Sequence, residues 1–178
     1  PLAVALASLD GASAGQATQV FVLHPGLAEE SIAKIHSRMK HVSVQWICVD
    51  EEKVAGAHFS TFLTNASLYR LLIGDLLPPE LDRVIYIDAD TVVVDSLAAL
   101  HAHELGDNIV GAVRDAGSPW AAGAREVPWR ELGLDADGPY LNSGMMLVDL
   151  KRWREADIGN ATLSVLRRLR PIWGDQDG

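Results

Sequence analysis

Two carboxylates, Asp88 and Asp90, stand one residue apart at the end of the apolar run VIYI in the segment RVIYIDADTVVVDS. Residues i and i+2 of an extended chain point to the same side, so both carboxylates could converge on one ion. Two carboxylates held close together repel unless a cation or a proton lies between them. Because oxygen ligands suit Mg²⁺ or Mn²⁺, the pair indicates a metal site, with an ordinary solvated strand end as the alternative.

The same segment permits a second chemistry. It resembles the first motif of haloacid-dehalogenase-type phosphatases, in which Asp88 would be the nucleophile. That motif has Gly after its second Asp, whereas this chain has Thr91, and the motif opens its fold, whereas this segment lies in mid-chain. The phosphatase therefore stays an alternative to the metal site.

Three further polar residues occupy positions that need an explanation. Arg70 lies in a leucine-rich segment, LYRLLIGDLLP, where an arginine must be paired with a carboxylate or must face a ligand. Asp115 directly follows a predicted strand, and Asn142 precedes another. The Asn142 amide suits the recognition of hydroxyl groups, but an Asx turn would also account for Asn142 and Gly144.

The elements that must position these residues alternate along the chain. Strands are predicted at 19–24, 42–49, 84–87, 109–113 and 145–150, and helices at 2–9, 27–40, 65–77, 96–105, 151–156 and 161–169. The segment 116–139, rich in Gly, Pro, Ala and Asp, predicts a long loop with a helical turn at 129–132. Strands that alternate with helices predict an α/β fold with a mostly parallel central sheet.

Composition narrows the function classes. The chain has 178 residues and a formal net charge of −9, which argues against nucleic acid as a partner. An acidic protein that binds a phosphorylated ligand needs a local Arg or Lys, a helix N-terminus or a bridging cation. The single Cys48 fits a reducing compartment, and its setting, VQWICV, predicts a buried thiol.

Five strings together, in this order, closely resemble glycosyltransferase family 8. They are LYRL at 68–71, RVIYIDADTVVVDSL at 83–97, GAVRD at 111–115, YLNSGMMLVDLKRWRE at 140–155 and DQD at 175–177. The resemblance implies a GT-A fold, that is, a Rossmann-like nucleotide-diphospho-sugar transferase. It also implies a retaining transfer of galactose or glucose from a UDP-sugar to a saccharide or glycolipid, as in lipopolysaccharide biosynthesis, with Mn²⁺ or Mg²⁺ as cofactor.

The resemblance also implies roles for particular residues. Asp88 and Asp90 would bind the metal, and the backbone of Ala89 would lie near the ribose. The residues that would contact the rest of the donor are Arg70, Asp115, Asn142 and Asp175. Gln176 would lie on the sugar face opposite the departing UDP, so Gln176 and Asp175 are the predicted catalytic residues.

Two departures from the family pattern concern the ends of the chain. We expect a single catalytic domain, 1–178, without the family's opening strand and its C-terminal part, which carries a third metal ligand, a His. A sugar-nucleotide-binding domain without turnover is therefore a further alternative.

The basic strings KRWRE and RRLR predict solvated helix faces, with contact to an anionic membrane surface as the alternative. The expected location is the cytoplasm, with the inner membrane face as the place of any such contact.

Overall fold

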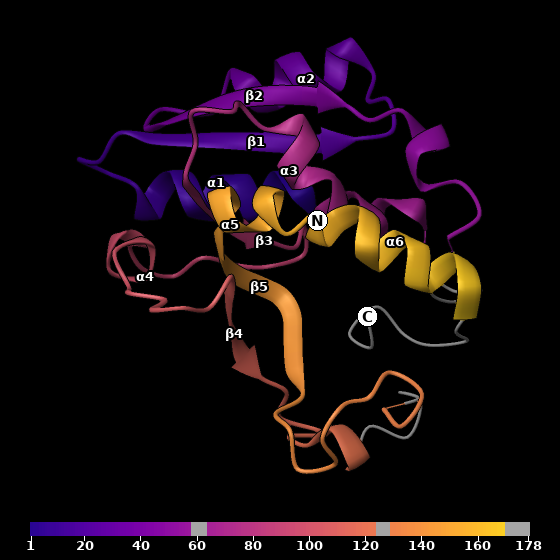
Figure 1. The fold of residues 1–178 in the computed structure, drawn as a ribbon. Coiled ribbons are helices and arrows are strands. Elements are labelled where there is room, and N and C mark those ends of the chain that lie inside the picture. The colour runs from indigo at the N-terminus through magenta and orange to yellow at the C-terminus, as the bar shows by residue number, and fades with distance from the viewer. Residues whose placement is uncertain (58–63, 124–128, 170–178) are drawn as a thin grey trace.

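A computed structural model describes residues 1–57, 64–123 and 129–169, and Figure 1 shows its fold. The strands are β1 (Thr18–His24), β2 (Val42–Cys48), β3 (Arg83–Ile87), β4 (Val110–Arg114) and β5 (Leu141–Asp149). The α-helices are α1 (Leu2–Ala12), α2 (Glu29–His36), α3 (Ile73–Leu76), α4 (Ala98–His101), α5 (Leu150–Glu155) and α6 (Ile158–Leu169). Short 3₁₀ helices are η1 (Glu51–Val54), η2 (Asn65–Leu72) and η3 (Ala121–Gly123).

The strands form two sheets. β1 and β2 are parallel and are joined through α2, as a parallel pair requires. In the other sheet, β5 lies between β3 and β4 and is antiparallel to both. The predicted α/β class is confirmed, and the predicted parallel order holds for β1 and β2. β5 departs from that order because it runs antiparallel to β4, the strand before it in the chain, and the described residues between them, 115–123 and 129–140, form no α-helix.

The main core lies between β5 and the helices that cover it. Val148 and Leu150 are fully buried, and Trp153 and Leu163 pack in the same cluster as η2. Gly159 brings α6 close to η2, because a Cβ there would lie 2.1 Å from the carbonyl oxygen of Leu71. The core therefore fixes η2, which carries Arg70, against β5.

The predicted helix at 65–77 is only partly correct. The chain forms η2 and then the single turn of α3, which ends before Pro78 as predicted. Thr64 takes the N-cap position without a side-chain hydrogen bond. Five consecutive residues of η2 are buried, Leu68–Leu72, so packing on all sides outweighs the helix propensity of this leucine-rich segment.

The basic strings on α5 and α6 have a structural role that the sequence did not predict. The guanidinium of Arg154 donates to one carbonyl within α3 and to several that follow it, those of Gly74, Leu77, Pro78, Pro79 and Leu81. Arg152 donates to Gly106 and Arg167 to Lys53 and Ala55. These arginines tie loops to helices, so they do not simply face solvent.

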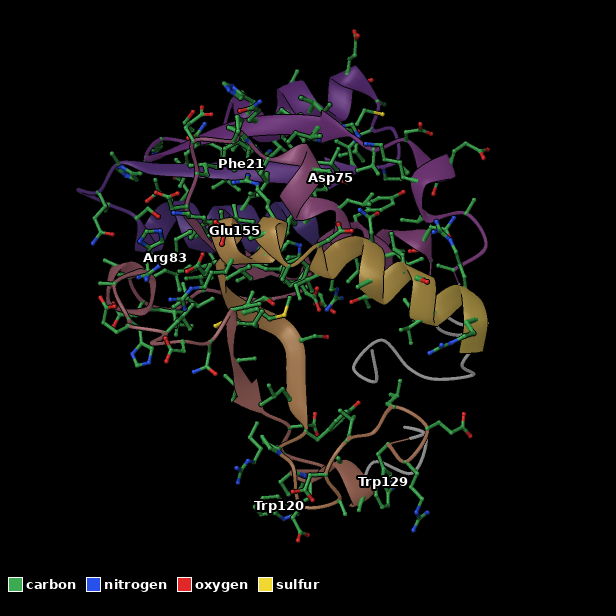
Figure 2. The ribbon with its side chains drawn as sticks, in the orientation of Figure 1. Phe21, Asp75, Arg83, Trp120, Trp129 and Glu155 are labelled. Atoms are coloured by element: carbon green, nitrogen blue, oxygen red, sulfur yellow. The ribbon has the colours of Figure 1, made fainter. Side chains whose placement is uncertain are left out.

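The described parts of the predicted loop, 116–123 and 129–139, extend beyond the ends of β4 and β5, and Figure 2 shows Trp120 and Trp129 there. Each tryptophan ring carries an arginine guanidinium, that of Arg114 at 4.4 Å from Trp120 and that of Arg130 at 4.2 Å from Trp129. The helical turn predicted at 129–132 is a hydrogen-bonded turn, in which the amide of Leu134 donates to the carbonyl of Trp129.

The predicted burial of the Cys48 thiol is wrong. Cys48 is exposed at the last residue of β2, and the next residue, Val49, is buried instead.

Within the described residues, the helices are too short or too polar to cross a membrane.

Asp10 joins the last turn of α1 to the beginning of β2. Its Oδ1 accepts hydrogen bonds from the amides of Lys40, His41 and Val42 at 2.8, 2.7 and 3.0 Å. Burial raises the pKa of this carboxyl, but the three amides outweigh that effect and hold the pKa below its ordinary value of 3.8. The ionised form of Asp10 therefore stabilises the fold.

Replacement of Asp10 by Asn should lower the free energy of unfolding by about 1–3 kcal/mol at neutral pH, since a neutral oxygen accepts more weakly. Because the pKa of Asp10 is lower in the folded state, its contribution is complete above 3.8 and is lost as the pH falls through the folded-state pKa. Urea unfolding of Asp10→Asn and of the exposed control Asp107→Asn, at pH 7 and pH 3, measures both effects. Equal stability of the two variants at pH 7 would contradict this account.

Candidate functional site

Three strands bring polar residues to one end of the second sheet. Asp88 directly follows β3 and Asp115 directly follows β4, while Asn142 lies at the beginning of β5. Since β5 is antiparallel to both neighbours, its beginning lies beside their carboxyl ends. The amide of Asp88 continues this pairing and donates to the carbonyl of Gly144 at 2.9 Å.

A bulge in β5 shapes this end of the sheet. Ala112 pairs with Met146, but the next residue, Val113, pairs with Asn142, so three residues of β5 have no partner on β4. A bulge bends its strand and redirects its side chains, and bulges are frequent beside active sites. Here it turns Ser143 and Gly144 toward the groups on β3 and η2.

Arg70 is buried on η2, and all three nitrogens of its guanidinium make hydrogen bonds. Nε donates to the carbonyl of Ser67, and one terminal nitrogen donates to both the carbonyl and the hydroxyl of Ser143 at 2.9 and 2.7 Å. The other terminal nitrogen lies 3.2 Å from Oδ1 of Asp88. Of the two roles that the sequence left open for Arg70, the structure therefore shows the carboxylate pair.

Asp88 has two unlike oxygens. Oδ1 accepts from Arg70 and also from the phenol of Tyr86, at 2.5 Å. Oδ2 lies beside Gly144, where a Cβ would come within 3.0 Å of it. The side chain is 23% exposed, so this carboxylate is held from one side and reachable from the other.

The prediction that Asp88 and Asp90 point to the same side requires an extended chain after β3, but the chain does not stay extended there. The amide of Thr91 donates to the carbonyl of Asp88 at 3.1 Å, which closes a turn around Ala89 and Asp90. Both of these residues are exposed. The prediction of an i, i+2 alternation is thus wrong, because strand pairing ends at Ile87 and the chain reverses.

Asp115 and Asn142 form a second polar pair. Oδ1 of Asp115 accepts from the amides of Ser118 and Gly117, both at 2.8 Å. These two hydrogen bonds, with a smaller contribution from the Asn142 side chain, hold the pKa of Asp115 below its ordinary value. Oδ1 of Asn142 accepts from the amide of Gly144 at 2.9 Å, which is the Asx turn that the sequence left open.

The donor set fits a hard divalent cation. Oδ2 of Asp88 and the exposed carboxylate of Asp90 supply the oxygen ligands that Mg²⁺ and Mn²⁺ prefer. Within the parts of the chain that the structure describes, no group of three or more His, Cys, Asp or Glu side chains could hold a metal ion. Water and phosphate oxygens commonly complete the coordination of Mg²⁺ beside one or two carboxylates.

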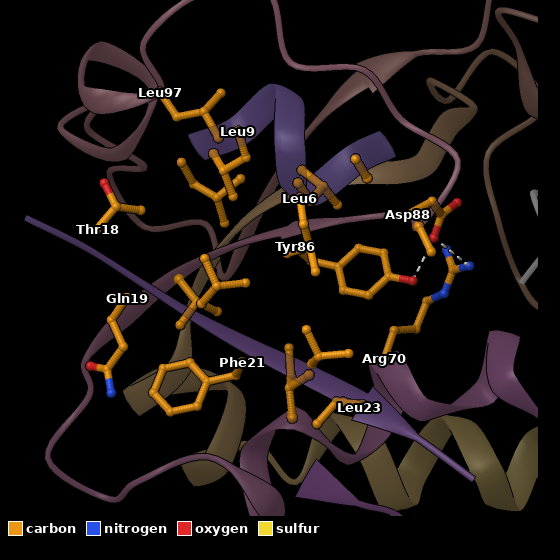
Figure 3. A pocket seen from close by; sticks show the side chains of 18 of the residues that line it. Leu6, Leu9, Thr18, Gln19, Phe21, Leu23, Arg70, Tyr86, Asp88 and Leu97 are labelled. Atoms are coloured by element: carbon orange, nitrogen blue, oxygen red, sulfur yellow. Dashed lines mark hydrogen bonds and ion pairs between the residues drawn. The ribbon is translucent and has the colours of Figure 1, made fainter. Parts of the chain in front are cut away.

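A cavity of about 830 Å³ lies beside this cluster and is lined by residues of β1 and β3, one strand from each sheet. Figure 3 shows its lining, with apolar side chains such as Leu6, Phe21 and Leu23 over most of its length. Arg70, Asp88, Ala89 and Asp90 all line it, and Figure 3 shows Arg70 and Asp88 together at one end. A phosphate-bearing ligand would meet this charged cluster only at that end of the cavity.

The two predicted catalytic residues, Asp175 and Gln176, lie outside the described residues. Two residues that the sequence argument missed, Tyr86 and Ser143, belong to the cluster. For Tyr86 a signal was available, because it precedes Asp88 by two residues and so faces the same side of β3.

Comparison with solved structures defines the fold. The model superposes on an active-site mutant of LgtC with a TM-score of 0.83 and 27% sequence identity, over 99% of this chain and 63% of that one. It superposes on the galactosyltransferase LgtC in complex with donor and acceptor sugar analogues with a TM-score of 0.80, over the same shares of the two chains. The chain thus has the GT-A fold, as predicted.

The chain belongs to glycosyl transferase family 8, whose family model matches residues 1–177. It is 30% identical to general stress protein A of Bacillus subtilis over 70% of this chain and 42% of that protein. It is 26% identical to the glycosyltransferase GlyF of Streptococcus pneumoniae serotype 4 over 88% of this chain and 36% of that protein. The chain therefore spans less than half the length of these two curated relatives.

Removal of the Arg70 guanidinium should destabilise the protein because it leaves Asp88 and Ser143 without their partner. We expect Arg70→Ala to lower the free energy of unfolding by about 2–4 kcal/mol, and Arg70→Lys to lower it by less. Urea unfolding of both variants, compared with the exposed control Arg38→Ala, measures this. The account fails if Arg70→Ala is as stable as that control.

Proposed function

We propose that this chain forms the donor-binding part of a metal-dependent, retaining glycosyltransferase. It would move galactose or glucose from a UDP-sugar to a saccharide or glycolipid acceptor. The observation that carries this proposal is the turn of Asp88 and Asp90 beside the buried Arg70, in a chain of family 8. The structural likeness to LgtC, solved with donor and acceptor sugar analogues, supports the two substrate classes.

In this proposal Asp88 and Asp90 hold Mn²⁺ or Mg²⁺ against the diphosphate of the donor. The bound cation would offset the negative charge that builds on the departing UDP. Arg70 adds a fixed positive charge beside Asp88, and its buried hydrogen bonds keep that charge in place. The backbone of Ala89, at the exposed tip of the turn, would lie near the ribose.

Asp115 and Asn142 would hold hydroxyl groups of the donor sugar. The lowered pKa of Asp115 keeps its carboxylate ionised at neutral pH, so it is a strong hydrogen-bond acceptor. The Asn142 side chain lies beside it. The two together thus offer both acceptor and donor groups, which suits a sugar hydroxyl.

We assign the reacting centre to Asp175 and Gln176. A glutamine amide is a poor nucleophile compared with a carboxylate, so we favour attack by the acceptor from the face that UDP leaves. In that mechanism Gln176 and Asp175 stabilise an oxocarbenium-like centre. A glycosyl adduct trapped on either residue would contradict it.

The activity test uses UDP-galactose or UDP-glucose with Mn²⁺ and measures the release of UDP. We expect release that stops on chelation, returns when Mn²⁺ is restored, and falls by about 100-fold or more in Asp90→Ala. The matched control is Asp107→Ala, which removes an exposed carboxylate between α4 and β4.

The two alternatives give different results in the same assay. UDP binding without any release in the presence of acceptor sugars would indicate a binding domain without turnover. Release of phosphate from a phosphomonoester, lost in Asp88→Asn, would indicate the phosphatase. Either result would contradict the proposed transfer.

A further inference from the structure

Two described residues hold the carboxylate of Asp88, and both do so through the same oxygen. Figure 3 shows Tyr86 and Arg70 approaching the same side of this carboxylate. Both hydrogen bonds end on Oδ1, from the phenol at 2.5 Å and from the guanidinium at 3.2 Å. Among the described residues, the polar contacts of the Asp88 side chain all fall on that oxygen.

This asymmetry has a mechanical consequence. The terminal torsion of an aspartate is broad, so a carboxylate without external contacts turns easily and exchanges its two oxygens. Two donors on a single oxygen prevent that exchange. The phenol makes the shorter bond and is neutral, so it fixes Asp88 without cancelling the negative charge.

Tyr86 is itself held in place by the residue with which it shares Asp88. The Arg70 guanidinium lies 4.9 Å from the centre of the Tyr86 ring, in cation–π contact. Arg70 is fixed in turn by Ser67 and Ser143. The position of Oδ1 is therefore set by η2, β3 and β5 together.

On the other side of the carboxylate, Gly144 leaves room for Oδ2. A Cβ at residue 144 would lie 3.0 Å from Oδ2 of Asp88 and 3.0 Å from Oδ1 of Asn142. Gly144 is not among the glycines with positive φ, so its backbone conformation does not require glycine. A Cβ there would press on both oxygens, so Oδ2 of Asp88 or Oδ1 of Asn142 would have to shift by a few tenths of an ångström.

We propose that Tyr86 and Gly144 are positioning residues that reserve Oδ2 of Asp88 for the divalent cation. Tyr86 does so by holding Oδ1, and Gly144 by leaving space beside Oδ2. The inference rests on the proposed function in one respect, that the cation binds at Asp88. It goes further in naming the oxygen and the two residues that select it.

Tyr86→Phe tests the first half of the proposal. The variant keeps the ring under Arg70 and removes only the hydroxyl, so Arg70 alone holds Oδ1 and the carboxylate turns more easily. We expect the Kd for Mn²⁺ in the presence of UDP, measured from the electron paramagnetic resonance of free Mn²⁺, to rise about 10–100-fold. The Kd for UDP alone, without metal, should not change.

Tyr69→Phe is the matched control. Tyr69 is buried, whereas Tyr86 is half-buried, and the Tyr69 phenol likewise donates to a carboxylate, that of Glu51 at 2.9 Å. Its removal should cost comparable stability and leave Mn²⁺ affinity unchanged. A loss of affinity in both variants would mean that general loosening of the fold is the cause, and it would overturn the assignment of Tyr86.

Gly144→Ala tests the second half without touching a hydrogen bond of Tyr86. The added Cβ should displace Oδ2 and weaken Mn²⁺ binding by about tenfold or more. Its control is Gly11→Ala in α1, where a Cβ meets nothing within 4 Å. Unchanged Mn²⁺ affinity in Gly144→Ala would overturn this half.

The results also separate this inference from the proposed function. Mn²⁺ binding that Asp88→Ala abolishes, but that Tyr86→Phe and Gly144→Ala leave unchanged, would overturn the inference and leave the proposed function in place. Absence of Mn²⁺ binding by the unaltered chain, with and without UDP, would overturn both.

Discussion

The ion pair between Arg70 and Asp88 is the contact around which the site is built. A buried guanidinium is costly unless acceptors surround it, and Arg70 finds them on three elements at once, at Ser67, Ser143 and Asp88. Because each acceptor comes from a different part of the chain, the arginine fixes η2, β3 and β5 relative to one another. The core beneath holds η2 in the position that these contacts require, because Gly159 allows α6 to approach Leu71 of η2 closely.

β5 supplies the other half of the arrangement. The bulge after Asn142 releases Ser143 and Gly144 from pairing with β4, and each then takes a separate role. Ser143 accepts hydrogen bonds from Arg70. The carbonyl of Gly144 accepts from the Asp88 amide, and the amide of Gly144 donates to the Asn142 side chain. A regular strand would direct these groups into the ladder with β4. The irregularity thus links the metal-binding turn to the Asp115–Asn142 pair.

Much of the fold and most residues of the polar cluster around Asp88 could be predicted from the sequence, because apolar periodicity and short sequence motifs are local features. Those features single out Arg70, Asp88, Asp115 and Asn142 as candidate site residues. Tertiary contacts decided what could not be predicted: the 3₁₀ conformation of η2, the turn at Asp88–Thr91 and the carbonyl partners of Arg154. In the sequence Tyr86 is part of an apolar strand; its place two residues before Asp88 indicates a shared face, and the tertiary structure adds the hydrogen bond between them.

The central claim is that Asp88 meets a divalent cation through Oδ2 while Arg70 and Tyr86 keep Oδ1. A crystal structure of the protein with Mn²⁺ and UDP, with manganese located by its anomalous scattering, tests this most directly. The account predicts manganese bound to Oδ2 of Asp88, with the Tyr86 and Arg70 hydrogen bonds to Oδ1 intact. Manganese bound through Oδ1 with Arg70 displaced, or bound away from Asp88, would contradict it.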